Sequence, residues 1–330
     1  HVANEKAYRD ELTGVKNKAA YKEMEALLER YSFSGVILFA QNTAENGQTL
    51  RLTDAIQKAN AVVPGRPQLL ISTDQEGGVV TRLGEGTQMP GNMALGAAGN
   101  SELTKQAATV IGQELSALGI NMDFAPVLDV NNNPNNPVIG IRSFSDDPQT
   151  VAEQGVSFMA ALQETGTIST LKHFPGHGDT DTDSHTGLPC INKTYDELKA
   201  NELIPFRAAV DAGAEVVMTA HIQYPQIETK TYQSIETGEN IYLPATLSRT
   251  ILTDILRGDM GYEGVIVTDA MDMDAIRTHF DPMDSARLAI EAGVDIILMP
   301  VDLSARDGMA QLEQYITKLT ALVANGTISE

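Results

Sequence analysis

The sequence of 330 residues contains a single cysteine, Cys190, and no tryptophan. One cysteine cannot form an internal disulfide, so the fold does not depend on oxidation. Basic residues are also few, with 23 lysines and arginines against 44 acidic side chains, which gives a formal net charge of −21. This deficit argues against nucleic acid or anionic lipid as the main partner, because lysine and arginine bind those partners.

Long hydrophobic runs are also absent. No apolar stretch approaches the roughly 18 residues of a membrane span, and the chain opens on polar residues without a visible signal peptide. We therefore expect a soluble protein of the cytoplasm or the cell-wall compartment that does not insert into membranes. The 27 glycines and 14 prolines are ordinary numbers for a chain of this length, so neither a disordered nor a fibrous protein is indicated.

The dominant pattern is an alternation of short apolar runs with longer amphipathic stretches. The short runs are continuous rather than alternating in polarity, which is typical of strands buried on both faces. The expected strands are 34–40, 67–74, 121–126, 167–174, 215–222, 264–270 and 295–300. The amphipathic stretches have apolar residues three and four positions apart, as in helices. The expected helices are 102–118, 149–164, 195–212, 247–256, 284–292 and 305–324.

Strands that alternate with helices predict a parallel sheet with helical crossovers. The chain lacks a dinucleotide-type GxGxxG motif after its first strand, so a (β/α)8 TIM-type barrel fits better than a doubly wound sheet. Seven strands are visible, and the missing one should precede residue 34, where the sequence is helix-like and charged. We expect one TIM-barrel catalytic domain over residues 1–330, with an irregular or missing first strand and an atypical segment at 1–24.

Polar side chains gather where the expected strands end. Active sites of such barrels form at the C-terminal ends of the strands. The strand ends carry Asp74, Asp129, the pair Lys172 and His173, His221 and Asp269. Side chains converging on one rim in this way predict a catalytic or binding site there.

The densest cluster is KHFPGHGDTDTDSH at residues 172–185, which contains three of the six histidines. It lacks the glycine and glutamate positions of a calcium loop. A transition-metal site using His173, His177, Asp179, Asp183 and His185 remains open, as does a turn rich in capping residues; without a metal, His177 is expected to shape the loop. A third interpretation is acid–base chemistry, with His185 carrying the proton and Asp183 fixing its tautomer.

Three further motifs contain candidate residues, and two interpretations remain open for Asp269 and for Arg142. Asp269 ends an apolar strand, so its carboxylate either enters the barrel mouth or caps the next helix. Asp74 ends another strand in STDQEGG, where glycines allow a sharp turn, and Arg82 follows eight residues later. Arg142 follows a loop rich in asparagine and proline. Its side chain either binds a ligand or holds that loop in place.

Five motifs in this order and spacing resemble glycoside hydrolase family 3, and within it the bacterial β-N-acetylglucosaminidases of NagZ type. They are STDQEGG, NMDFAPVLDV, IGIRSF, KHFPGHGDTDTDSH and VTDAMDM, and the resemblance runs from about residue 31 to residue 330. It implies a TIM-type barrel that removes terminal β-linked N-acetylglucosamine from peptidoglycan-derived fragments or chitooligosaccharides with retention. It implies no cofactor, no metal, and a monomer that acts on a small carbohydrate.

The resemblance also implies roles for individual residues. The nucleophile would be Asp269, forming a covalent glycosyl-enzyme intermediate, and the acid/base would be His185 paired with Asp183. The residues implied to bind sugar hydroxyls are Asp74, Arg82, Arg142, Lys172 and His173.

The chain departs from the family at both ends. Residues 1–24 lack the family's apolar first strand, and residues 10–21 resemble the opening helix of GGDEF domains, although no GGDEF motif follows. The family often continues for one more helix, so we expect a shortened C-terminal end. Alternatives to the hexosaminidase are a family 3 phosphorylase, a β-glucosidase-like enzyme, and a metal-dependent barrel hydrolase; activity that survives EDTA would remove the last of these.

Overall fold

The computed structural model describes residues 26–184, 187–303 and 307–328, and every structural statement below refers to these residues. The expected atypical segment 1–24 and the expected acid/base His185 lie outside them. Within the described part, no helix is long and apolar enough to cross a membrane.

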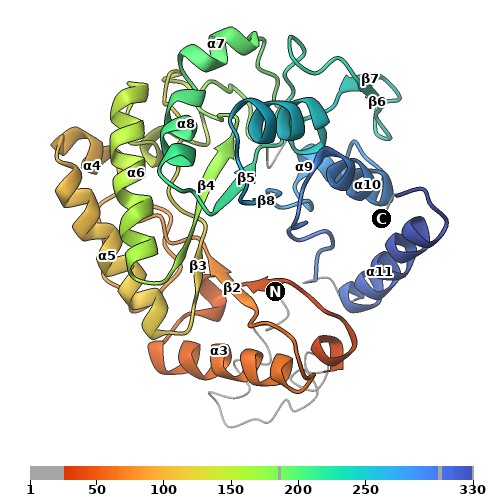
Figure 1. The fold of residues 1–330 in the computed structure, drawn as a ribbon, viewed down its shortest axis with the longest axis horizontal. Helices are drawn as coiled ribbons and strands as arrows, with labels where there is room; N and C mark the ends of the chain where they lie inside the picture. Colours follow the sequence, from red (N-terminus) through yellow and green to blue (C-terminus); the bar gives the residue numbers. More distant parts are fainter. Residues whose placement is uncertain (1–25, 185–186, 304–306, 329–330) are drawn as a thin grey trace.

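A curved sheet of six parallel strands forms the centre of the molecule (Figure 1). Its order is β1-β2-β3-β4-β5-β8, so each strand pairs with the next one of the barrel along the chain. All six lie within strands expected from the sequence, which confirms a TIM-like parallel fold, with an incomplete barrel among the described residues. The bounds are β1 Gly35–Ile37, β2 Leu70–Thr73, β3 Met122–Asp123, β4 Ile168–Phe174, β5 Val216–Thr219 and β8 Val265–Val267.

Helices surround this sheet on its outer face (Figure 1). The α-helices are α3 Asn46–Ala61, α4 Asn92–Ala98, α5 Ser101–Ala117, α6 Pro148–Glu164, α7 Tyr195–Ala200, α8 Leu203–Asp211, α9 Asp274–Arg277, α10 Pro282–Ala292 and α11 Gly308–Ala324. Short 3-10 turns cover η1 Ala40–Asn42, η2 Gly140–Arg142 and η3 Ala245–Leu247, and a π-helix, η4, covers Thr250–Asp259. A small antiparallel hairpin joins β6 Thr231–Gln233 to β7 Asn240–Tyr242.

Local sequence explains where several helices begin. The Asn100 side chain accepts a hydrogen bond from the Glu102 amide at the start of α5, and Asp147 caps α6 ahead of a proline in the first turn. The expected helix 195–212 is instead two helices. It breaks at Asn201, beside which the buried Glu202 carboxylate accepts hydrogen bonds from Asn132 and Lys193.

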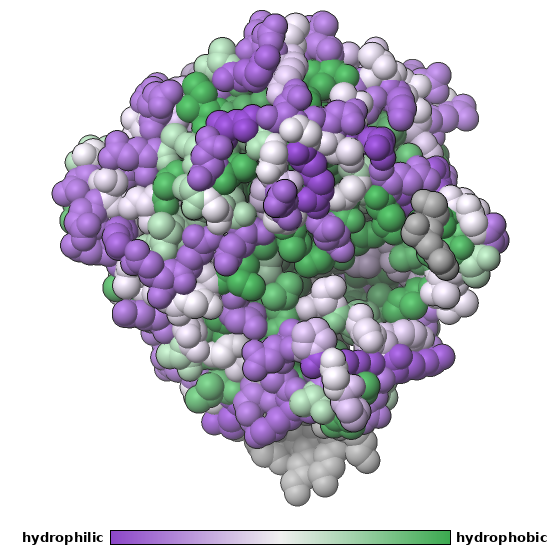
Figure 2. Space-filling model, in the orientation of Figure 1, coloured by the Kyte–Doolittle hydropathy of each residue, from purple (hydrophilic) through white to green (hydrophobic). Residues whose placement is uncertain are grey.

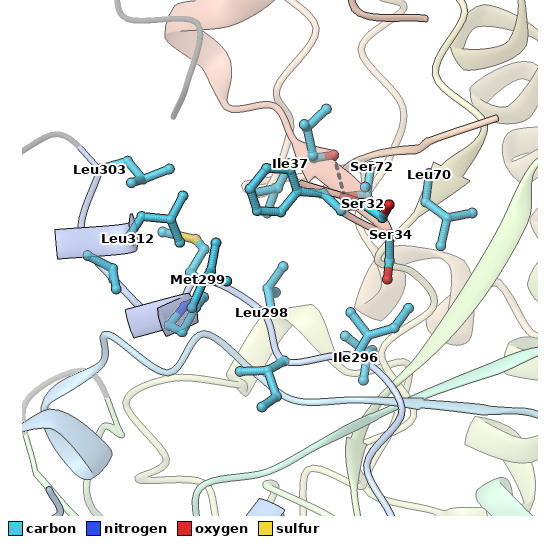
Figure 3. Close-up of a pocket in the computed structure, with 18 of the residues that line it drawn as sticks. Ser32, Ser34, Ile37, Leu70, Ser72, Ile296, Leu298, Met299, Leu303 and Leu312 are labelled. Carbon is cyan, nitrogen blue, oxygen red and sulfur yellow. Dashed lines mark hydrogen bonds between the residues drawn. The ribbon is translucent and has the colours of Figure 1, made fainter. Parts of the chain in front are cut away.

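The barrel is incomplete at one seam. The expected strand 295–300 makes a single parallel bridge, between Ile296 and Val267, and residues 26–30 are helical rather than extended. An apolar cavity of about 340 Å³ lies between β1, residues 295–301 and α11. Ile37, Leu298 and Leu312 line it from opposite sides (Figure 3), and Figure 2 shows a hollow with a hydrophobic rim in this region. The side chains at the charged ends of the strands do not line this cavity.

Candidate active site

The strand ends bring together the charged residues that the sequence placed there. Asp74 follows β2 directly, Lys172 and His173 lie near the end of β4, and Asp269 comes two residues after β8. Because β2, β4 and β8 belong to one parallel sheet, their C-terminal ends share one rim. The expected convergence at this rim is therefore present in the structure.

A row of alternating charges runs along one side of the rim. Lys172 Nζ lies 2.8 Å from Asp74 Oδ1 and 2.7 Å from Glu76 Oε1. Arg142 donates two hydrogen bonds to the Glu76 carboxylate, from Nε at 3.0 Å and from Nη2 at 2.7 Å. At the other end, Arg82 Nη2 lies 3.7 Å from Asp74 Oδ2. Three cations thus hold two carboxylates, and the five residues form one network.

Burial makes this network depend on its internal pairing. Lys172 and Glu76 are each 2% exposed, and an unpaired charge at such a place would be costly. Burial by itself would raise the pKa of Glu76, but Lys172 and Arg142 outweigh it and lower the pKa to about 2. For Lys172, burial favours the neutral amine, whereas Asp74 and Glu76 raise its pKa above the usual value. Both groups are therefore charged at neutral pH.

Replacing Lys172 with methionine should destabilise the fold strongly. The change leaves Asp74 and Glu76 without the cation between them, and breaking such a buried pair costs roughly 3–5 kcal/mol of unfolding free energy. Urea unfolding of the variant and the wild type measures this difference. The matched control is Lys58→Met, because Lys58 pairs with Asp54 on an exposed face of α3, where the cost should stay below about 0.5 kcal/mol. Similar small losses in both variants would contradict the pairing.

A second polar group centres on the fully buried Asp129. Its Oδ2 lies 2.7 Å from His173 Nδ1, and its Oδ1 accepts hydrogen bonds from the backbone amides of His173, at 3.1 Å, and His177, at 2.7 Å. Burial raises the pKa of this carboxyl, but His173, His177 and the amide of His177 outweigh it, so the pKa lies below its usual value. Asp129 therefore orients His173 at the rim and holds the start of the following loop.

His177 is a buried histidine in the loop that follows β4. Burial and the neighbouring His173 lower its pKa from 6.5 to about 4, although Asp129 acts in the opposite direction. Its Nδ1 lies 2.9 Å from Thr180 Oγ1 and its Nε2 lies 3.2 Å from Ser184 Oγ. The imidazole is therefore neutral at pH 7 and has a hydrogen-bond partner at each nitrogen.

This buried neutral histidine should make the protein less stable in acid. Between pH 6.5 and 4 the unfolded chain binds a proton at His177 that the folded chain does not, so stability falls as the pH falls. The limiting contribution is about 3 kcal/mol. We expect the free energy of unfolding of wild type to fall more steeply over this window than that of His177→Gln. His279→Gln, a change at a partly exposed histidine, is the control; a slope in His177→Gln equal to that of wild type would contradict the account of His177.

Asp269 lies on the same rim, two residues after the end of β8. Its Oδ1 accepts a 2.8 Å hydrogen bond from the Ala270 amide. Burial raises its pKa, but the neighbouring His173 and His221, this amide and Lys172 outweigh that effect and lower the pKa below the usual value. His221 is itself fixed, with Nδ1 2.8 Å from Thr246 Oγ1 and Nε2 3.0 Å from the Ala270 carbonyl oxygen. These neighbours keep the Asp269 carboxylate ionised at neutral pH.

The structure unites most of the residues expected at the site. Asp74, Arg82, Arg142 and Lys172 share one network. Asp269 follows a strand of the same sheet, and His173 and Lys172 help to lower the pKa of its carboxyl. Asp183 is described in the loop after β4, whereas His185 lies outside the described residues.

Sequence reasoning missed the Glu76 carboxylate, noted Asp129 without a partner, and gave His177 only as a possible metal ligand or a residue that shapes its loop. Glu76 stands in STDQEGG, but its partner Arg142 is 66 residues away, so no local spacing shows the pair. Asp129 was noted at a strand end, yet its hydrogen bonds with His173 and His177 depend on the pairing of β3 with β4. Among the described residues, no group of three or more histidines, cysteines and acidic residues is placed to hold a metal ion.

A barrel of parallel strands with a charged rim of this kind defines the class of TIM-type barrels whose sites lie at the strand ends. The chain belongs to glycosyl hydrolase family 3: the model of the family's N-terminal domain matches residues 4–330.

Individual relatives agree with this assignment. The chain is 42% identical over 315 residues to "Beta-hexosaminidase A" of Pseudoalteromonas piscicida, covering 93% of this chain and 52% of that protein. It is similar to a family 3 β-N-acetylglucosaminidase structure from Paenibacillus sp. str. FPU-7, with a TM-score of 0.85, 44% identity, and coverage of 93% of this chain and 55% of that one. It is also similar to NagZ from Neisseria gonorrhoeae in complex with N-trifluoroacetyl-D-glucosamine, with a TM-score of 0.73, 33% identity, and coverage of 91% and 86%. The chain thus spans about half the length of the first two relatives.

Proposed function

We propose that this chain is a retaining exo-β-N-acetylglucosaminidase that removes terminal N-acetylglucosamine from peptidoglycan-derived fragments. The observation that carries the proposal is the Asp269 carboxylate, which follows β8 at the rim of strand ends and whose pKa His173, His221 and Lys172 help to lower. The relatives named as β-hexosaminidases and β-N-acetylglucosaminidases support the same chemistry. We propose further that residues 1–330 form one catalytic barrel that acts as a monomer.

In the first step, the Asp269 carboxylate attacks the anomeric carbon and the bond from that carbon to the leaving oxygen breaks. The lowered pKa of Asp269 suits this role, because only the ionised carboxylate is a nucleophile. His185, paired with Asp183, protonates the leaving oxygen. The product of this step is a covalent glycosyl-aspartate.

In the second step, the now neutral imidazole of His185 takes a proton from water, and the oxygen of that water attacks the anomeric carbon. The glycosyl–aspartate bond breaks and the sugar leaves with its original β configuration. A histidine suits this pairing with Asp269 because its basic form carries no negative charge, and its ordinary pKa near 6.5 permits both roles around neutral pH. Phosphate in place of water would give the phosphorolytic variant.

The charged network beside Asp269 is proposed to bind the sugar. Asp74 keeps part of its surface exposed while Lys172 and Arg82 flank it, so its oxygens can accept hydrogen bonds from sugar hydroxyls. Arg142, Lys172 and His173 supply donors on the same rim. Glu76 lies beneath them and holds Lys172 and Arg142 in place.

Hydrolysis of a phenyl N-acetyl-β-glucosaminide, compared with the matching phenyl β-glucoside, tests this function. We expect turnover of the first substrate, β-configured N-acetylglucosamine as the first product by NMR, and activity that survives EDTA. Preference for the glucoside would favour the β-glucosidase-like alternative, and loss of activity with EDTA followed by recovery with Zn²⁺ would favour the metal-dependent hydrolase. Formation of a sugar phosphate in phosphate buffer would identify a phosphorylase.

A further inference from the structure

Hydrogen bonds hold the loop after β4 in place at Ser184, the residue between Asp183 and the proposed acid/base His185. Ser184 is 2% exposed. Its hydroxyl oxygen lies 3.2 Å from His177 Nε2, and its carbonyl oxygen accepts a 3.2 Å hydrogen bond from the Ala275 amide. Ala275 belongs to α9, which begins five residues after Asp269. The peptide beside the acid/base is thus tied both to the β4 side and to the nucleophile side of the rim.

The neighbouring hydrogen bonds decide which nitrogen of His177 carries the proton. Thr180 Oγ1 donates to the His177 carbonyl oxygen at 3.1 Å and accepts from Asn136 Nδ2 at 3.2 Å. Since a hydroxyl has one hydrogen and two lone pairs, its remaining lone pair faces His177 Nδ1 at 2.9 Å. Nδ1 therefore donates, and Nε2 is left to accept the hydrogen of the Ser184 hydroxyl.

His177 is well placed to serve as a fixed anchor. Its backbone amide donates to Asp129 Oδ1 at 2.7 Å, and its ring meets the His173 ring edge to face, with centroids 5.7 Å apart. Burial and His173 lower its pKa to about 4, so the neutral tautomer persists at neutral pH. The residue is 1% exposed, so its ring contacts the loop rather than a ligand.

We propose that His177 is a positioning residue for the acid/base loop: its Nε2 accepts the Ser184 hydroxyl hydrogen and fixes the peptide that follows Asp183. This role rests on the proposed function, because it acts through the Asp183 and His185 pair. Proton transfer to a leaving oxygen requires the acid within hydrogen-bond reach. A displacement of about 1 Å at such a group can cost roughly 10²-fold in rate.

If His177 positions the loop, removing it should lower kcat/KM by an amount that depends on the leaving group. In His177→Ala we expect kcat/KM for a phenyl N-acetyl-β-glucosaminide to fall about 10²-fold, while a 2,4-dinitrophenyl substrate, which leaves without acid assistance, keeps most of its rate. Ser184→Ala should reproduce the pattern, and the double variant should lose little more than either single variant. His177→Gln, whose amide reaches toward Ser184, should recover part of the phenyl rate.

A role in overall folding alone would lower both substrates equally, because it reduces the amount of active protein; equal losses in His177→Ala would overturn the proposal. The matched control is His279→Ala, at a histidine that pairs with Ser234 beside the hairpin, and its ratio of phenyl to dinitrophenyl rates should equal that of wild type.

Hydrogen exchange tests the anchor without relying on activity. In His177→Ala we expect amides of residues 179–184 to exchange faster, with strand amides of β5 and β8 unchanged. Unchanged exchange at 179–184 would overturn the positioning role. If wild type hydrolysed neither N-acetylglucosaminide, the proposed function would fail while the exchange experiment would still decide the anchor.

Discussion

Replacing Asp269 with alanine should lower kcat/KM on aryl N-acetyl-β-glucosaminides by roughly 10⁴-fold or more, the scale of loss seen when a covalent nucleophile is removed. The leaving group should matter little, because without the carboxylate no glycosyl-enzyme forms with any aglycone. Rates from single turnover and steady state measure the effect. Added azide should restore part of the turnover by attacking from the vacated side, and the product should be the α-glycosyl azide.

The control for this variant is Asp254→Ala, which removes an exposed carboxylate from the surface of η4. Its kcat/KM should stay within about twofold of wild type, as expected for a surface change. An Asp269→Ala protein with nearly normal turnover would show that another group is the nucleophile.

His185→Ala should produce the second large effect, and its size should depend on the substrate. With a phenyl leaving group, acid assistance is essential, and we expect a loss of about 10²–10⁴-fold in kcat/KM. With a 2,4-dinitrophenyl leaving group the first step should be nearly unaffected, so the second step, which lacks its base, becomes rate-limiting. Asp183→Ala should show the same pattern with smaller losses, because the imidazole remains.

The pH dependence of kcat/KM supplies a further comparison for the His185 variant. Wild type should show a fall at high pH as the general acid loses its proton, and that limb should disappear for the phenyl substrate in His185→Ala. Equal losses with both leaving groups would contradict the acid/base assignment.

The sequence predicted the parallel strands because each is a short apolar run buried on both faces, as in β4 and β5. It also predicted the rim, since polar residues directly follow those runs. It did not predict the small hairpin of β6 and β7, whose burial is low and whose apolar pattern is weak. Strand 295–300 was expected on composition, but in the structure it forms a single parallel bridge, between Ile296 and Val267.

The missed site residues were hidden by long-range pairing. Glu76 becomes part of the site only because β2 and β4 bring Lys172 to it and η2 brings Arg142. His177 was expected to be either a metal ligand or a residue that shapes the loop, whereas the structure shows hydrogen bonds from its ring to Thr180 and Ser184. Local patterns therefore identify which residues can do chemistry, while the fold decides which of them support the others.

Intact-protein mass spectrometry of His185→Ala with the 2,4-dinitrophenyl substrate tests the proposed mechanism most directly. The first step should proceed and the second should be slow, so we expect a population carrying one N-acetylglucosaminyl group, which peptide mapping places on Asp269. A label on another residue, or rapid turnover with no adduct at any time, would contradict a covalent mechanism through Asp269.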